Sequence, residues 1–239
     1  MAIDTLLFDC DNTLVLSEHL AFEGCAELVN SLIKAHALPL EPFTGPTLQQ
    51  KYVGQNFRGM LSSLASEYSL PITQEELEVY VKKEEEVVIA KLQAALEPCE
   101  GVKPVLDDLE RSGKYTLAVV SSSALRRVNV SLEKTGLAGY FGDRVYSAAT
   151  SMPEPSSKPD PAIYVFALAK LGKNADTAVA VEDSRSGTTS AVRAGIRTIG
   201  YLGAYPPEER EDMGRVLKEA GAIVNINHWD EFEDALKKL

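Results

Sequence analysis

The chain has 239 residues, 45% of them hydrophobic and 25% charged, a balance that suits a globular protein with a sizeable core. Its net charge is −11, and a surface this acidic repels nucleic-acid backbones and anionic membranes, so we expect neither as a partner. The three cysteines are widely spaced and match no metal or disulfide pattern, and neither a signal peptide nor a long apolar segment is recognised. We therefore expect a cytoplasmic monomer.

Short apolar runs that end in polar residues predict the strands of a sheet. After position 100 these runs alternate with segments of helical periodicity, most of which close on a glycine. Continuous apolar strands that alternate with helices are typical of a parallel sheet covered on both faces, so we predict the α/β class. The predicted strands are 5–8, 116–120, 144–147, 178–181, 197–201 and 222–225. The predicted helices after position 100 lie in 102–113, 124–136, 161–172 and 187–195.

Between residues 17 and 96 the pattern changes to helices alone. Segments 18–38, 56–70 and 73–96 have helical periodicity and are joined by loops that contain proline and glycine. The simplest arrangement is an α/β core made of residues 1–16 and 97–239, with an all-α domain of residues 17–96 inserted after the first strand. The alternative is one continuous fold with long helices between its first two strands.

Two predicted strands end in pairs of acidic residues. Asp9 and Asp11 follow the first strand in "LLFDCDNTLV", and Glu182 and Asp183 follow "AVAV" before a glycine-containing turn. Ligands of open parallel sheets bind at the carboxyl ends of the strands, where these acids would lie. Oxygen ligands from two strand ends favour a hard divalent cation, and we expect magnesium. The alternatives are solvated turn residues for the first pair and a salt-bridged strand end for the second.

Polar residues of a different kind follow the strand that ends in "LAVVSSSA". Hydroxyl groups and backbone amides near Ser121 and Ser122, facing the start of a helix, are suited to phosphate oxygens. The alternative for Ser121 is an N-cap of that helix. Lys158 comes directly before a helix that begins with proline, and one lysine would balance the charge of several carboxylates and an anion. Most lysines in such a place are simply exposed.

In order and spacing, these segments resemble the four motifs of the haloacid dehalogenase superfamily of phosphohydrolases. "FDCDNTLV" is similar to the first motif, Ser121 to the second, Lys158 to the third and "VEDS" to the fourth. The helical insertion resembles the cap of the branch that includes β-phosphoglucomutase and phosphoglycolate phosphatase, which implies a Rossmann-like core. Asn12 stands where the family usually has glycine, and asparagine tolerates the same unusual backbone angles.

The resemblance implies a magnesium-dependent phosphatase acting on a small phosphorylated metabolite, such as a sugar phosphate. Asp9 would attack phosphorus to form an aspartyl phosphate, and Asp11 would act as general acid and then general base. The phosphate contacts that we expect in the core are Thr13, Ser121, Ser122 and Lys158. The magnesium ligands that we expect are Asp9, Asp183, the backbone carbonyl of Asp11 and, more weakly, Glu182.

Residues of the helical insertion would select the substrate. Arg58, Lys82 and Lys83 are the expected anion contacts there, and the alternative is that all three are solvated. Phe57 occupies the position where mutases of this branch carry an arginine, which favours hydrolysis. The remaining alternatives are a phosphomutase of the β-phosphoglucomutase type and a non-catalytic phosphate-binding module. Dehalogenation is disfavoured because that branch of the superfamily lacks the acid corresponding to Asp11.

Overall fold

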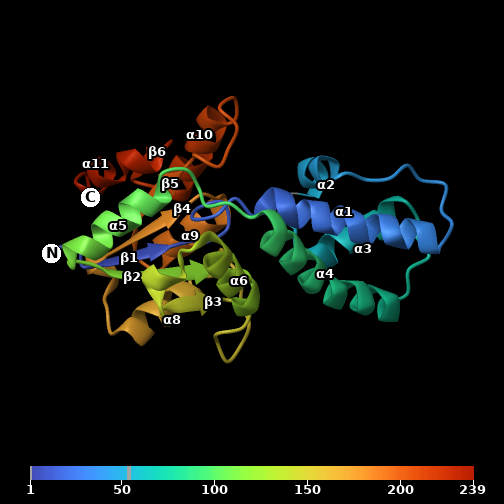
Figure 1. Ribbon diagram of the computed structural model, residues 1–239, viewed down its shortest axis with the longest axis horizontal. Helices are drawn as coiled ribbons and strands as arrows, with labels where there is room; N and C mark the ends of the chain where they lie inside the picture. Colours follow the sequence, from blue (N-terminus) through green and yellow to red (C-terminus); the bar gives the residue numbers. More distant parts are fainter. Residues whose placement is uncertain (1, 53–54) are drawn as a thin grey trace. The chain divides into compact units, whose positions relative to one another are not determined.

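The computed structural model of the protein describes residues 2–52 and 55–239 (Figure 1). The chain divides into two compact units. The core unit comprises Met1–Leu16 and Glu97–Leu239, and the helical unit comprises Ser17–Leu96. Among the described residues, no helix has both the length and the apolar composition needed to cross a membrane.

The core unit is built on one sheet of six strands in the order β3-β2-β1-β4-β5-β6. Every strand pairing in it is parallel, so the predicted α/β class with a parallel sheet is confirmed. In the centre, Phe8 of β1 lies opposite Val119 of β2 on one side and Val181 of β4 on the other. The strands are β1 Thr5–Phe8, β2 Thr116–Ser121, β3 Val145–Ser147, β4 Ala178–Glu182, β5 Arg197–Tyr201 and β6 Val224–Ile226.

Helices cover both faces of this sheet (Figure 1). Because side chains alternate along a strand, Leu7 and Phe8 point to opposite faces. Leu7 belongs to a buried cluster with Ile163 of α8, whereas the ring of Phe8 lies 6.0 Å from the rings of both Phe141 and Trp229. The helices are α5 Val102–Ser112, α6 Leu125–Thr135, α7 Ala138–Phe141, α8 Ala162–Leu171, α9 Arg185–Arg193, α10 Arg210–Ala220 and α11 Phe232–Leu236, with short 3₁₀ turns at Ala175–Thr177 and Trp229–Glu231.

Glycines end four of the core helices, as the sequence predicts for three of them. Helices α5, α6, α8 and α10 each stop at a residue with left-handed backbone angles, which glycine adopts without steric cost. These residues are Gly113, Gly136, Gly172 and Gly221. The helix α10 itself was not predicted from the sequence, and only Leu217 of its residues is buried.

The helical unit has its own hydrophobic core, to which all four of its helices contribute. Helix α1 packs against α2 and α4, and α3 packs against α4. Buried side chains from the four helices include Val29, Leu48, Leu61 and Tyr80. The helices are α1 Glu18–Ala35, α2 Gly45–Tyr52, α3 Phe57–Glu67 and α4 Gln74–Ala95.

Helix α2 falls in a stretch read from the sequence as a loop. Two threonines organise its start: the Thr44 N–H donates to Thr47 Oγ1 at 2.9 Å, and the Thr47 N–H donates to Thr44 Oγ1 at 3.3 Å. Pro46 lies in the first turn, where a missing N–H costs no helical hydrogen bond. The proline that suggested a loop is therefore compatible with a helix start.

The chain leaves and re-enters the core unit at one place. Val15 and Pro98 form an antiparallel bridge. The Leu16 N–H donates to the Glu97 carbonyl at 3.0 Å, and the Cys99 N–H donates to the Leu14 carbonyl at 2.9 Å. The two crossing segments are thus paired on the core side of the insertion.

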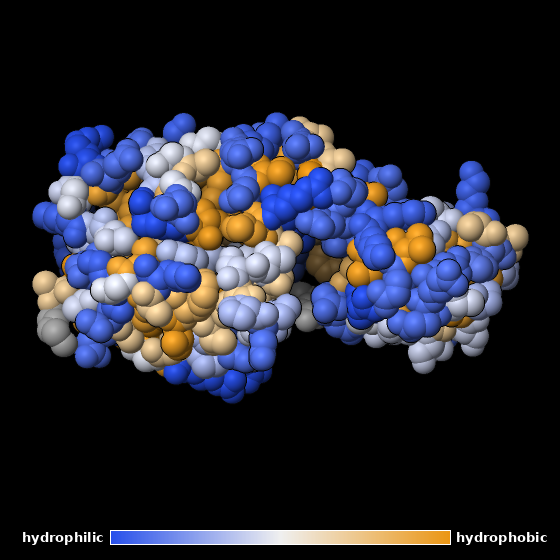
Figure 2. Space-filling view, turned by 90° about the horizontal axis from the view of Figure 1, so that it is seen from below, coloured by the Kyte–Doolittle hydropathy of each residue, from blue (hydrophilic) through white to orange (hydrophobic). Residues whose placement is uncertain are grey.

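Hydrophilic and hydrophobic residues are interspersed over the face drawn in Figure 2. Large hydrophobic side chains that are exposed among the described residues are single valines and one isoleucine from separate elements, namely Val79, Val165, Val192 and Ile223. Single exposed apolar side chains are normal on protein surfaces and indicate no interface.

Candidate active site

The carboxyl ends of three neighbouring strands bring the predicted site residues of the core unit together. Phe8 lies opposite both Val119 and Val181, so the polar residues that end these strands meet at one edge of the sheet. Asp9 comes directly after β1, Ser121 ends β2, and Glu182 ends β4. All three are buried. The sheet topology therefore gathers residues separated by more than one hundred positions in sequence.

Lys158 joins two of the acids. Its Nζ donates to Asp9 Oδ1 at 2.6 Å, to Glu182 Oε1 at 2.6 Å and to the Val120 carbonyl at 2.7 Å. These three bonds use all the donors of an ammonium group. Its side chain is only 4% exposed. The alternative of an ordinary exposed lysine is therefore wrong.

Burial and charge act against each other in this cluster. Burial raises the pKa of Asp9, and the neighbouring Lys158 opposes the rise. Burial also raises the pKa of Glu182, to about 7, again against the effect of the lysine. For Lys158, burial alone would lower the pKa, but the two carboxylates together raise it above its ordinary value. The lysine thus stays charged between two acids whose ionisation it supports.

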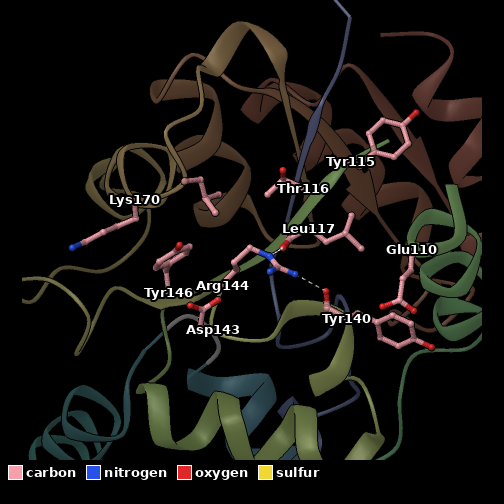
Figure 3. A pocket seen from close by; sticks show the side chains of 10 residues that line it. Glu110, Tyr115, Thr116, Leu117, Tyr140, Asp143, Arg144, Tyr146 and Lys170 are labelled. Carbon is pink, nitrogen blue, oxygen red and sulfur yellow. Dashed lines mark hydrogen bonds between the residues drawn. The ribbon is translucent and has the colours of Figure 1, made fainter. Parts of the chain in front are cut away.

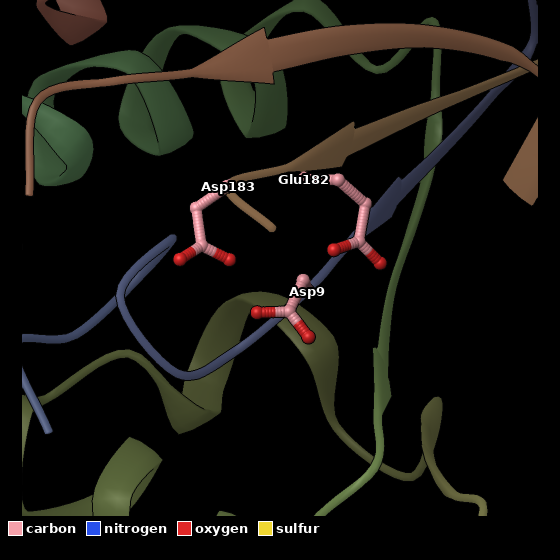
Figure 4. Close-up of side chains that lie close together, drawn as sticks. All are labelled: Asp9, Glu182 and Asp183. Carbon is pink, nitrogen blue, oxygen red and sulfur yellow. The ribbon is translucent and has the colours of Figure 1, made fainter. Parts of the chain in front are cut away.

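Asp9, Glu182 and Asp183 form a carboxylate cluster that could hold a metal ion (Figure 4). One ligand oxygen from each lies within 4.8 Å of the others. Three buried carboxylates beside one lysine carry surplus negative charge, and carboxylate oxygens are the donors that magnesium and calcium prefer. The residues present therefore fit a hard divalent cation.

The three carboxylates of this cluster differ in their other contacts. Glu182 Oε1 accepts from Lys158 and from the hydroxyl of Tyr164, while its Oε2 faces the α-carbon of Gly187. Oε2 has no hydrogen-bond partner among the described residues. Asp183 accepts instead from Thr13 Oγ1 at 3.4 Å. Glu182 is thus held as a counter-ion of the lysine.

A tight turn after β1 separates the two acids of the first motif. The Asn12 N–H donates to the Val15 carbonyl at 2.7 Å, and the Leu14 N–H donates to the Cys10 carbonyl at 3.0 Å. Asn12 has a φ of 57°, the left-handed angle anticipated at the position where the resembling family has glycine. The chain therefore curls away from the strand between Asp9 and Asp11.

Asp11 consequently has different surroundings from Asp9. It is half-buried, and its two oxygens accept from two residues that follow β2. Ser123 Oγ donates to Asp11 Oδ2 at 2.6 Å, and Arg127 Nη2 donates to Asp11 Oδ1 at 3.2 Å. One acid is thus buried against a lysine, and the other faces a more open space beside an arginine.

The three predicted phosphate-binding hydroxyls lie around the same edge, and each of them already has a protein partner. Ser121 is fully buried and its Oγ accepts from the Ser123 N–H at 3.0 Å. Ser122 is exposed, and its Oγ accepts from the Lys158 N–H at 3.3 Å. Thr13 is fully buried with its hydroxyl on Asp183, which differs from the direct phosphate contact expected of it.

Arg58 and Lys83 belong to the helical unit, where each has a partner. Both terminal nitrogens of Arg58 donate hydrogen bonds to the carboxylate of Glu78. The Lys83 ammonium lies 5.1 Å from the centre of the Tyr80 ring. Both side chains are exposed on the surface of this unit. The bidentate ion pair of Arg58 means that an anionic ligand would compete with Glu78 for it.

Sequence reasoning missed three residues of the site. Ser123 and Arg127 contact Asp11, and the hydroxyl of Tyr164 donates to Glu182 from within helix α8. Ser123 belongs to the serine run that was singled out, so its hydroxyl could have been included. Tyr164 lies in an apolar helical segment, and nothing in that pattern marks its hydroxyl as part of a site.

A hollow of about 590 Å³ lies at the other end of β2 (Figure 3). It is lined by Thr116 and Leu117 at the start of this strand, whereas Ser121 ends it. Arg144 borders the hollow and donates to the carbonyls of Leu117 and Tyr140. The carboxylate cluster lies at the opposite end of the strands, so this hollow is separate from the candidate active site.

Comparison with protein families gives a match over most of the chain. Residues 3–195 match the model of the haloacid dehalogenase-like hydrolases. The matched range begins before β1 and ends after α9, so it contains the carboxylate cluster, Lys158 and the inserted helical unit.

Individual relatives are similar over most or all of their length. A phosphorylated carbohydrates phosphatase of Thermotoga maritima is 27% identical, with 99% of this chain and 100% of the relative covered. A 6-phosphogluconate phosphatase of Escherichia coli is 25% identical over 85% of this chain and 84% of its own. The crystal structure of a haloacid dehalogenase-like protein of unknown function from Agrobacterium tumefaciens superposes with a TM-score of 0.78 at 28% identity, covering 99% and 98% of the two chains.

Proposed function

The chain belongs to the haloacid dehalogenase-like hydrolases, and from this premise we propose that it hydrolyses phosphate monoesters of small metabolites with the help of magnesium. The observation that carries the proposal is the unlike placement of the two acids of the first motif. Asp9 is buried on Lys158, whereas Asp11 is half-buried and faces Ser123 and Arg127. Two carboxylates in different surroundings can perform different steps of one reaction.

Asp9 is the proposed nucleophile. Its carboxylate attacks phosphorus, the bond from phosphorus to the ester oxygen breaks, and an aspartyl phosphate forms. Lys158, 2.6 Å from Asp9, keeps this carboxylate ionised and offsets the negative charge of the arriving phosphoryl group. Ser121 and Ser122 at the end of β2 are the proposed contacts for phosphoryl oxygens. Thr13 supports the site by orienting Asp183.

Asp11 is the proposed acid–base group. It gives a proton to the leaving alcohol in the first step, and it takes a proton from the water that hydrolyses the aspartyl phosphate in the second. Asp9, Asp183 and the Asp11 carbonyl are the proposed ligands of magnesium, with Glu182 a weaker one. When bound, the ion offsets the repulsion between the anionic nucleophile and the phosphate.

The proposed substrates are monophosphates of sugars, sugar acids or polyols. The names of the Thermotoga maritima and Escherichia coli relatives, a phosphorylated carbohydrates phosphatase and a 6-phosphogluconate phosphatase, support this class. We propose that the helical unit acts as a cap that selects among them, with Arg58 and Lys83 as anion contacts. Arg58 would then exchange Glu78 for an anionic group of the substrate.

A panel of phosphorylated metabolites, assayed for free phosphate in the presence of magnesium, tests the proposal. We expect phosphate release from some members, and loss of all turnover in Asp9→Asn, with p-nitrophenyl phosphate as a common reference. Conversion of a sugar 1-phosphate to its 6-phosphate without phosphate release would favour the phosphomutase. Phosphate binding without any turnover would favour the non-catalytic module.

A further inference from the structure

We infer that Ser123 and Arg127 form a clamp that positions the Asp11 carboxylate, and that Arg127 acts through Asp11 without binding the substrate itself. The inference rests on the proposed function, because it presupposes acid–base work by Asp11. It adds two positioning residues that were not among the predicted site residues.

The clamp holds both oxygens of one carboxylate. Ser123 Oγ donates to Oδ2 at 2.6 Å, and Arg127 Nη2 donates to Oδ1 at 3.2 Å. The terminal torsion of an aspartate is soft, so a single hydrogen bond would leave the carboxylate free to turn. Two donors on different oxygens fix its rotation as well as its place. Asp11 thus presents one face to the leaving group at a defined angle.

Both residues that donate to Asp11 are held in place by the surrounding structure. The Ser123 N–H donates to Ser121 Oγ at 3.0 Å, and the Ser123 carbonyl accepts from Ser147 Oγ at 2.7 Å. Ser123 is therefore tied to the ends of β2 and β3. Arg127 lies in the first turn of α6, and its side chain is only 19% exposed. Both donors to Asp11 are thus anchored to strands or a helix of the core unit.

A guanidinium in this place could instead bind an anionic group of the substrate. The geometry favours the positioning role, because Arg127 forms an ion pair with Asp11 and most of its side chain is buried. The two roles give different kinetics. Loss of a substrate contact weakens binding of every substrate that uses it, whereas loss of a positioning contact matters most where the leaving group needs a proton.

The experiment compares two substrates that differ in this need. Phenyl phosphate has a poor leaving group, and p-nitrophenyl phosphate has a good one. We use kcat/KM with magnesium present, because this ratio reports the step in which the leaving group departs. Arg127→Gln should lower kcat/KM by about ten-fold or more for phenyl phosphate, and clearly less for p-nitrophenyl phosphate. Arg127→Lys should recover part of the loss, since it keeps the charge but not the fork of donors.

A double-mutant cycle decides whether Arg127 acts through Asp11. In an Asp11→Asn background, Arg127→Gln should cause little further loss, because the group that it positions is already disabled. Ser123→Ala should show the same dependence on Asp11 and serves as the test if Arg127→Gln does not fold. Arg126→Gln, an exposed arginine on the same helix, is the matched control and should behave as wild type.

Two failures are distinguishable. Full additivity of Arg127→Gln with Asp11→Asn, or an equal loss for both substrates, would overturn the clamp while leaving the proposed function in place. A wild-type rate for Asp11→Asn itself with phenyl phosphate would instead overturn the acid–base role on which the clamp depends.

Discussion

Replacing Lys158 by methionine would test how the charges of the site are balanced. The substitution keeps a similar volume but removes the three hydrogen bonds that the ammonium donates to Asp9, Glu182 and the Val120 carbonyl. Two buried carboxylates then lose their common partner. Removing one partner of a buried ion pair costs about 3–5 kcal/mol, because the remaining charge is left without compensation in the protein interior.

The cost should depend on pH in a defined direction. Burial already raises the pKa of Glu182 to about 7 with the lysine present, and without it the pKa values of Glu182 and Asp9 rise further. In the unfolded chain both carboxyls titrate near pH 4. Between that pH and the raised values the folded protein binds more protons than the unfolded one, so the free energy of unfolding falls as pH rises. We expect a loss of about 3–5 kcal/mol at pH 8 and a smaller loss at pH 5.

Urea unfolding followed by tryptophan fluorescence measures this loss. Trp229 is the single tryptophan and is buried in the core unit, so its signal reports the unit that contains Lys158. A chelator in the buffer keeps divalent cations from contributing. Lys170→Met, an exposed lysine on α8, is the control and should change stability little at either pH. A loss below about 1 kcal/mol at pH 8, or an equal loss at both pH values, would refute the reasoning.

Three further predictions concern activity. Gly187→Ala should remove most phosphate release, because a Cβ at this position would lie 1.8 Å from Glu182 Oε2. In the control Gly139→Ala, the added Cβ meets no atom within 4 Å, so this variant should be neutral. A wild-type rate of phosphate release in Gly187→Ala would contradict this prediction. A chelator should abolish turnover, and added magnesium should restore it. Asp183→Ala should raise the magnesium concentration needed for half-maximal rate. Full activity in excess chelator would show that the reaction needs no metal ion. Arg58→Ala should raise KM for the preferred metabolite and leave p-nitrophenyl phosphate unaffected; equal changes for both substrates would argue against a selecting role.

The fold was largely predictable because the signals that specify it are local. Buried parallel strands need continuous apolar runs, and helix ends need glycine, so both can be read from short stretches. The strand boundaries agree within two residues, with β6 at Val224–Ile226 where 222–225 was predicted. The hydrolase family indicated by the motifs is confirmed by the family match. Helix α2 escaped prediction because its start depends on a pair of threonine hydroxyls.

The site was less predictable, because its contacts join distant parts of the chain. Asp11 and Arg127 are 116 positions apart, and only the meeting of β1 and β2 brings them within 3.2 Å. Tyr164 joins Glu182 from a helix whose pattern is explained by packing alone. The direction of the Thr13 hydroxyl, toward Asp183, is set by the turn after β1. Motif spacing can place residues at one edge of a sheet, but it cannot say which side chain each of them contacts.

The paired crossing between the two units has a consequence for how such a protein can evolve. Two backbone hydrogen bonds and the Val15–Pro98 bridge hold the ends of the insertion side by side. The entropy of closing a long insertion grows only slowly with its length, and here the closure is made by the core itself. A helical unit of another size or sequence could therefore be grafted between residues 16 and 97 without disturbing the strands or the carboxylates. The substrate selection proposed for the helical unit and the chemistry proposed for the core could then diversify independently within one continuous chain.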